Sequence, residues 1–343
     1  MRSLQRKVEA VIGGKVFKWG SKILVEEANL VQKEIEVGTK GLTVNYYERN
    51  LQELYGNASH SSSNASAPPQ PTLLLCHGMT DESLSMAPML LKVKKQIDPN
   101  WRVIIPDLIG HGKDLERANK VGVKNFEYPT PSDLVQSMDD FLTALKIKEC
   151  YAFGISLGGA LVYYLQQKRP DVIKKSVLVS PAVEAVVDEM FINDFVQGRK
   201  NHFCFESRHD VKILMRDLSC PQRKHNNPVP KFFLEAVWQD RLSREPTGHF
   251  RTYFLNLLNH RGKDPEYWGS PLDLAPELPR LVIWPQEDYI ANHDKGKTFF
   301  SQSPNTVFHS LPDSGHLFLA DRRTVLEYAA PMMMDYFKED DEK

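Results

Sequence analysis

A serine flanked by glycines is the first residue of this chain whose setting suggests chemistry. Residues 154–158 are Gly-Ile-Ser-Leu-Gly, after the apolar stretch 150–153 and before the helix-like run 159–165. A G-x-S-x-G pentapeptide between a strand and a helix describes a nucleophile elbow, a tight turn that pushes the serine hydroxyl out of the sheet. Glycines are needed because the turn brings the strand and helix backbones together. We therefore predict that Ser156 is a nucleophile.

A serine hydroxyl is a weak nucleophile, so it needs a base to take its proton and an acid to orient that base. His316 is the best base, because it lies in a loop after the last apolar segment. Asp288 is the best acid, since it closely follows the predicted strand 281–284. In a doubly wound sheet such loops meet at the carboxyl ends of the strands. The alternative for His316 is an ordinary loop histidine, and the rivals for the acid are Glu287, Asp294 and Asp188.

Two backbone amides are predicted to stabilise negative charge on a substrate oxygen. Leu157, next after the nucleophile, offers one N–H at the start of a helix. Met79 offers the other, because it follows the predicted strand 72–76 and a glycine that permits close approach of the backbone. Amides held in this way form an oxyanion hole. We interpret the neighbouring His77 as a residue that orders this loop, and a base function for it is the less favoured alternative.

The elements that must position these residues alternate along the chain. Short apolar runs are separated by helical segments, among them residues 132–145 with Ser132 as a predicted N-cap. Such runs between helices are typical of a parallel sheet covered on both faces. We therefore predict an α/β protein with a doubly wound, mostly parallel sheet. Its predicted strands are 72–76, 101–105, 151–153, 176–179, 281–284 and 306–308, preceded by two more at 34–37 and 42–47.

The pattern divides the chain into four parts. Residues 1–33 form a basic, amphipathic N-terminal extension, residues 34–181 the first part of the core, and residues 279–343 its second part. Residues 182–278 contain no apolar strand but many aromatic residues interleaved with charges, which predicts a helical cap inserted over the sheet. Residues 52–71 are rich in Ser, Asn, Ala and Pro and are predicted to be a surface loop.

Composition narrows the class of protein. The 343 residues are 41% hydrophobic and 25% charged, as in ordinary soluble domains, and the net charge of −1 gives no support for nucleic-acid binding. The four cysteines lack metal-site spacing, and Cys76 and Cys150 are expected to be buried thiols. No 18-residue apolar run and no secretory signal is present, so we expect an intracellular protein, in the cytoplasm or at a membrane surface. The glycines of residues 154–159 fit neither Rossmann nor Walker spacing, and we expect no metal or cofactor.

Four motifs follow one another along the chain: His77-Gly78-Met79, residues 107–112 (Asp-Leu-Ile-Gly-His-Gly), the elbow, and Asp288 with Gly315-His316. Together they resemble the α/β-hydrolase superfamily over about residues 40–335. Three positions depart from the common pattern of that superfamily. Ile109 stands where many members have proline, Asp114 where many have serine, and Pro285 where a glycine is frequent. These departures concern loops that shape the site.

Within the superfamily, the chain is similar to the monoacylglycerol lipase and esterase branch. A serine at the elbow sets it apart from haloalkane dehalogenases and epoxide hydrolases, which have an aspartate. The resemblance implies hydrolysis of a small-molecule ester or lipid with an apolar acyl group, by Ser156, His316 and Asp288 through an acyl-enzyme. The alternatives are a carbon–carbon bond hydrolase, an acyltransferase and a non-catalytic ligand-binding protein. Residues 1–30 are interpreted as an extra packed helix, with a membrane-surface anchor or an organelle presequence as the alternative.

Overall fold

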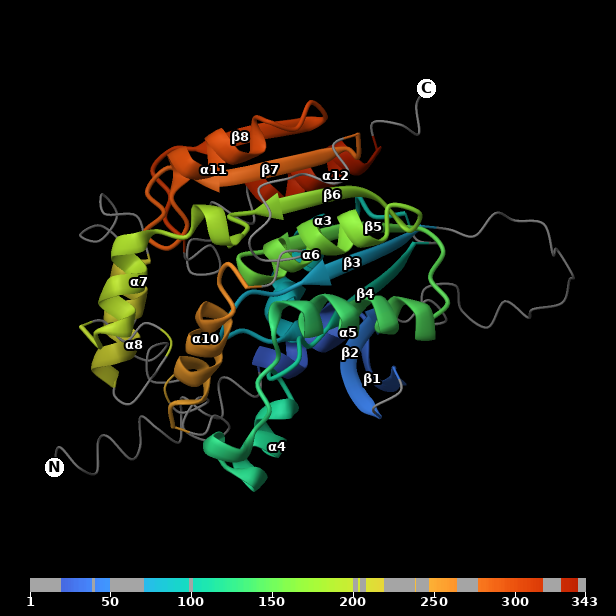
Figure 1. Cartoon of the computed structure of the whole chain (residues 1–343). Coiled ribbons are helices and arrows are strands. Elements are labelled where there is room, and N and C mark those ends of the chain that lie inside the picture. The colour runs from blue at the N-terminus through green and yellow to red at the C-terminus, as the bar shows by residue number, and fades with distance from the viewer. Residues whose placement is uncertain are drawn as a thin grey trace, which may run out of the picture.

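The centre of the molecule is an eight-stranded sheet with strand order β1-β2-β4-β3-β5-β6-β7-β8 (Figure 1). The computed structural model describes residues 20–38, 41–49, 71–98, 101–199, 203, 208–218, 238, 247–263, 277–316 and 328–338. The strands are β1 (Leu30–Val37), β2 (Leu42–Arg49), β3 (Thr72–Cys76), β4 (Arg102–Pro106), β5 (Cys150–Ile155), β6 (Ile173–Val179), β7 (Arg280–Pro285) and β8 (Thr306–Leu311).

The sheet is mostly parallel, as predicted. β1 and β2 pair antiparallel, as do β2 and β4, and every pair from β4 to β8 is parallel. β3 has β4 on one side and β5 on the other, so the chain winds outward in both directions from it. β1 begins at Leu30 instead of the predicted residue 34. Its start escapes the pattern because mostly exposed residues separate the buried ends, Leu30 and Val37.

Helices cover both faces of the sheet (Figure 1). α5 (Pro131–Ala144), α6 (Leu157–Lys168) and α11 (His293–Phe300) cover one face, and α3 (Ala87–Val93) and α12 (Ala330–Lys338) cover the other. Leu74 packs in the first core, whereas Leu73 and Leu75 pack in the second. This alternation follows from the two-residue repeat of a strand. Because both faces are buried, the central strands are apolar at successive positions and are visible in the sequence as continuous runs.

The N-cap of α5 differs from the prediction. Thr130, not Ser132, caps the helix: its Oγ1 accepts the Asp133 N–H at 3.1 Å, and the Asp133 carboxylate accepts the Thr130 N–H at 2.9 Å. This reciprocal pair is a capping box. Pro131 is the first helical residue, a position where proline fits because its missing N–H would have no helical partner. The proline therefore moves the cap upstream of Ser132.

Removing the cap hydroxyl is expected to destabilise the protein modestly. Thr130→Ala deletes the acceptor for the Asp133 N–H, which lowers the free energy of unfolding by about 1 kcal/mol. Ser132→Ala is the matched control, and we expect a clearly smaller effect because that hydroxyl does not cap the helix. Urea unfolding followed by circular dichroism compares the two variants. Equal shifts of the unfolding midpoint would contradict the assignment of the cap.

The segment between β6 and β7 is helical in its described parts. It contains η3 (Glu184–Val186), α7 (Glu189–Val196), α8 (Arg208–Asp217) and α10 (His249–Asn259). α7, α8 and α10 lie on the side to which the strand arrows point (Figure 1). A third core joins this segment to Leu115 and Ile290 of the sheet's own connections, so many of its aromatic residues serve its packing. The buried phenylalanines of this core are Phe191, Phe195, Phe203, Phe250 and Phe254.

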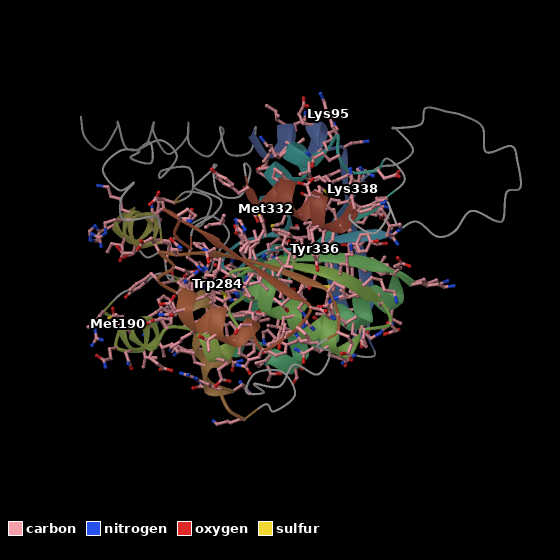
Figure 2. All side chains as sticks on the ribbon, turned by 90° about the horizontal axis from the view of Figure 1, so that it is seen from above. Lys95, Met190, Trp284, Met332, Tyr336 and Lys338 are labelled. Carbon is pink, nitrogen blue, oxygen red and sulfur yellow. The ribbon has the colours of Figure 1, made fainter. Side chains whose placement is uncertain are left out.

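The remaining described elements are short. They are η1 (Ser83–Met86), α4 (Asp114–Val121) and η2 (Val123–Asn125), and residues 20–27 are also helical. Met190, at the start of α7, lies far across the molecule from Lys338, where α12 ends (Figure 2).

Several predictions fall outside the described residues: the amphipathic face of residues 1–19, almost all of the 52–71 loop, and Cys204 and Cys220.

Cys76 and Cys150 are buried free thiols, as predicted. Burial raises the pKa of Cys76 to about 12, so the thiol stays protonated. None of the helices in the described ranges is both long enough and apolar enough to cross a membrane. Within the same ranges, no group of three His, Cys, Asp or Glu side chains is arranged to hold a metal ion.

Candidate active site

Ser156 lies in the turn between β5 and α6, in a backbone conformation unusual for a serine. Its φ is 53° and its ψ is −115°. The Ser156 N–H donates to the Val179 carbonyl of β6 at 2.9 Å, and its own carbonyl accepts the N–H groups of Ala160 and Ala182, each at 3.0 Å. A non-glycine residue held at positive φ is strained, and such strain is typical of a nucleophile elbow.

The glycines around Ser156 are required by close backbone contacts. A Cβ atom at Gly158 would overlap the carbonyl oxygens of Cys76 and His77, where β3 ends. A Cβ atom at Gly154 would overlap the backbone of Gly158. The elbow therefore presses the start of α6 against the ends of β3 and β5, which explains why both flanking positions are glycine.

The structure brings the predicted nucleophile, base and acid together. His316 Nε2 lies 3.0 Å from Ser156 Oγ, and His316 Nδ1 lies 2.7 Å from Asp288 Oδ2. The side chain of Asp288 is fully buried and that of His316 is 7% exposed. With Nδ1–H donating to the carboxylate, Nε2 is left to accept the serine proton. The arrangement can therefore move a proton from Ser156 to the imidazole and stabilise the resulting charge.

Four hydrogen bonds hold the Asp288 carboxylate in place. Oδ1 accepts the N–H groups of Ile290 and Ala291, each at 2.9 Å, and Oδ2 accepts the Ser180 hydroxyl at 2.8 Å as well as His316 Nδ1. A fully bonded carboxylate keeps the imidazole in one orientation and one tautomer. Sequence reasoning missed Ser180. Its place directly after β6, at the carboxyl end of the sheet, is the signal that points to it.

The rival acids have other functions in the fold. Asp188 caps α7, with its carboxylate accepting two backbone N–H groups of that helix. Asp294 lies in the first turn of α11 with a side chain that is 94% exposed. Glu287 is an exposed neighbour of Asp288. Of the four candidates, only Asp288 hydrogen-bonds His316.

His77 orders the loop after β3. Its Nε2 accepts the Leu108 N–H at 3.1 Å, and its Nδ1 lies 2.9 Å from the Gly78 carbonyl oxygen. The residue is fully buried. It therefore ties the loop after β3 to the loop after β4, and both ring nitrogens are engaged away from Ser156.

The two predicted oxyanion residues border the same space as Ser156. Met79 and Leu157 line one cavity together with Ser156. Leu157 is the first residue of α6, so its N–H has no acceptor within the helix. An amide in that position can donate to a negatively charged oxygen formed on a substrate next to Ser156.

The loop of residues 107–112 is fixed by α10. The Tyr253 hydroxyl donates to the Ile109 carbonyl at 2.9 Å, and His249 Nε2 lies 2.8 Å from the Gly110 carbonyl oxygen. Burial lowers the pKa of His249, so the ring is neutral and donates from Nε2 while Nδ1 accepts the Tyr128 hydroxyl at 3.2 Å. Ile109, which stands where many members of the superfamily have proline, thus lies in a loop whose carbonyl groups accept hydrogen bonds from the segment between β6 and β7.

A cavity with a largely apolar lining opens at Ser156. Aromatic and aliphatic side chains of the β6–β7 segment form much of its wall, among them Phe203, Phe254 and Leu257. Besides Ser156, the polar side chains among the described lining residues are those of Glu184 and Arg261. A largely apolar space with a few polar groups is typical of a site for a small molecule.

A family model for the alpha/beta hydrolase fold matches residues 71–322, which is most of the chain. The chain belongs to the α/β-hydrolase family. The matched residues include the elbow, Asp288 and His316, as well as the β6–β7 segment. The superfamily and the fold class predicted from the sequence are therefore confirmed, whereas the match does not select a branch of the family.

Solved structures similar to this α/β-hydrolase include proteins named as lipid and ester hydrolases. A bacterial membrane phospholipase A superposes with a TM-score of 0.72 at 14% identity, over 98% of this chain and 96% of that one. A candidate lipase from Acinetobacter baumannii gives 0.68 at 20% identity, over 93% and 96%. A carboxylesterase from Bacillus subtilis gives 0.62 at 14% identity, over 95% and 98%. At these identities the likeness shows the fold.

Curated relatives match a shorter stretch. Uncharacterized proteins of Mycobacterium bovis and Mycobacterium tuberculosis are 31% identical to this α/β-hydrolase over 111 residues, which is 32% of this chain. The match spans 29% of the length of these relatives.

Proposed function

We propose that this α/β-hydrolase is a serine hydrolase that cleaves carboxylic esters with an apolar acyl group. The observation that supports the proposal best is the continuous hydrogen-bond chain from Asp288 through His316 to Ser156, which ends at an apolar cavity. A buried imidazole that can take the serine proton activates the hydroxyl. The apolar cavity offers the acyl chain a favourable environment, because burial removes its surface from water.

In the proposed mechanism, Ser156 Oγ attacks the ester carbonyl carbon while His316 Nε2 takes the serine proton. The carbonyl oxygen becomes an oxyanion, which accepts hydrogen bonds from the Met79 and Leu157 amides. The tetrahedral intermediate collapses, the ester C–O bond breaks, and the imidazolium protonates the departing alcohol. Water, deprotonated by His316, then attacks the acyl-enzyme and releases the carboxylic acid with Ser156 restored. Asp288 stays ionised and stabilises the imidazolium. The mechanism requires no metal or cofactor.

The proposed substrates are acyl lipids such as monoacylglycerols, or carboxylic esters of similar size. Support comes from the lining, in which Phe203, Phe254 and Leu257 form part of one wall. We extend the proposal to the segment 182–278, which would act as a cap whose helices close the cavity above Ser156. Contact of residues 1–30 with a membrane surface would bring such an enzyme to its lipid substrate.

A fluorophosphonate probe tests the activated serine. We expect the full-length protein to be labelled and the Ser156→Ala variant to show no labelling, because the probe reacts with a serine whose proton a neighbouring base can take during attack. Hydrolysis of p-nitrophenyl esters from acetate to dodecanoate then tests the acyl site. kcat/KM should rise with chain length, since each buried methylene contributes about 0.8 kcal/mol. An unlabelled wild-type protein would overturn the mechanism, and a preference for acetate would overturn the lipid substrate.

A further inference from the structure

Two charged residues interrupt the apolar wall of the cavity at Ser156. Glu184 begins η3, shortly after β6, and Arg261 follows the end of α10. Arg261 Nε donates to Glu184 Oε1 at 3.1 Å, and the Gly262 N–H donates to Glu184 Oε2 at 3.2 Å. The side chain of Glu184 is 16% exposed and that of Arg261 is 34% exposed. The pair therefore joins two parts of the wall and lies partly shielded from water.

A second carboxylate makes this cluster net negative. Arg261 Nη2 donates to Glu189 Oε1 at 2.5 Å, and the Glu189 side chain is 56% exposed. Glu189 is not one of the described residues that line the cavity. The hydrogen bond from Arg261 lowers the pKa of Glu189, so this carboxylate is ionised at neutral pH. One guanidinium therefore faces two carboxylates, those of Glu184 and Glu189.

The Glu184–Arg261 pair, which lines the cavity, carries both kinds of hydrogen-bonding group. A guanidinium has five N–H donors, of which Arg261 uses two in the bonds described above, and a carboxylate has further lone pairs beyond the two bonds to Glu184. A hydroxyl group both donates and accepts hydrogen bonds, so it can bond to either member of the pair. An apolar group would displace water from the pair without replacing the lost hydrogen bonds, which is unfavourable. A phosphate or carboxylate would meet a net negative cluster in partly shielded surroundings.

We propose that the Glu184–Arg261 pair determines leaving-group specificity: it admits a neutral alcohol that carries further hydroxyl groups and excludes an anionic one. The inference rests on the ester hydrolysis proposed above. An apolar acyl chain fits the aliphatic and aromatic walls, which leaves the polar wall for the alcohol side of the ester. The pair would thus select polyol esters over simple alkyl esters and over phosphorylated esters of the same acid.

Three substrates that share one acyl chain test this specificity: 1-decanoylglycerol, ethyl decanoate and 1-decanoylglycerol 3-phosphate. We expect the wild-type protein to give the highest kcat/KM with 1-decanoylglycerol and the lowest with the phosphate ester. Glu184→Gln keeps the size of the side chain and an acceptor for Arg261 but removes the charge. It should raise the phosphate-to-glycerol ratio of kcat/KM by roughly 10- to 100-fold.

A second substitution tests the recognition of hydroxyl groups. Glu184→Leu removes both acceptors and should lower the preference for 1-decanoylglycerol over ethyl decanoate by roughly 10-fold. Glu189→Gln is the matched control, because it breaks an ion pair to the same arginine outside the cavity. We expect it to change the preference for 1-decanoylglycerol over ethyl decanoate by less than about 2-fold, as for an exposed ion pair. It should raise the phosphate-to-glycerol ratio clearly less than Glu184→Gln does, because solvent screens the charge of the exposed Glu189 side chain. If the Glu184–Arg261 pair only held two parts of the fold together, substitution of Glu184 would lower kcat/KM for all three esters by a similar factor.

The outcomes separate this inference from the proposed function. If the probe labels Ser156 and ethyl decanoate is hydrolysed, but neither ratio changes in the Glu184 variants, the specificity assignment is wrong and the hydrolase proposal stands. A Glu189→Gln variant that shifts the ratios as much as Glu184→Gln does would also overturn the assignment. A wild-type protein that is neither labelled nor active on the three esters overturns both proposals.

Discussion

Asp288→Asn is expected to lower kcat for ester hydrolysis by about 10⁴-fold while the fold is retained. The reason lies in the bonds to the carboxylate. Oδ1 accepts two backbone N–H groups, so an asparagine places its carbonyl oxygen there and its NH₂ group toward His316. The NH₂ group then donates to Nδ1, which leaves the proton of the neutral imidazole on Nε2, facing Ser156. That tautomer cannot accept the serine proton.

The prediction is checked by kcat on a p-nitrophenyl ester together with the thermal unfolding midpoint. Asp294→Asn is the matched control, because Asp294 is one of the rival acids suggested by the sequence but its exposed side chain does not contact His316. We expect the control to have wild-type kcat. A fully active Asp288→Asn variant would show that the imidazole does not need this acid, and the triad assignment would fail.

The parts of the fold that sequence predicts well are those with one dominant physical signal. The central strands are buried on both faces, so they appear as uninterrupted apolar runs. Ser156, the proposed nucleophile, is marked by glycines that close backbone packing requires, and Asp288 and His316 follow strands whose carboxyl ends meet at one edge. β1 lacks such a signal because its middle is mostly exposed, and the sequence pattern therefore predicts its start too late.

The residues whose roles could not be predicted from the sequence act through contacts between distant segments. Ser180 hydrogen-bonds the Asp288 carboxylate across 108 positions, and Arg261 reaches Glu184 across 77. Neither contact leaves a local periodicity or a motif. The N-cap of α5 was missed for a different reason. Thr130 and Ser132 are both acceptable cap residues, and Thr130 is favoured by Pro131 at the first helical position and by Asp133 at the third, which completes the capping box.

Gly158→Ala is expected to disrupt both stability and activity through one added methyl group. Its Cβ would overlap the carbonyl oxygens of Cys76 and His77, which are backbone atoms at the end of a buried strand and cannot turn aside as a flexible side chain does. The elbow must then move away from the loop that carries Met79. We expect the free energy of unfolding to fall by about 1–3 kcal/mol, as for other overpacked cores.

Activity should fall further than stability suggests, because the same movement separates Ser156 from the groups around it. A displacement of about 1 Å in a catalytic group can reduce turnover about 10²-fold. Gly20→Ala is the matched control: its Cβ meets no atom within 4 Å and its φ is not positive, so we expect unchanged unfolding and unchanged kcat. Urea unfolding and ester hydrolysis by the folded fraction distinguish the two effects. A Gly158→Ala variant with wild-type stability and kcat would mean that the elbow tolerates a side chain at this contact, and that the glycine spacing in the sequence has another cause.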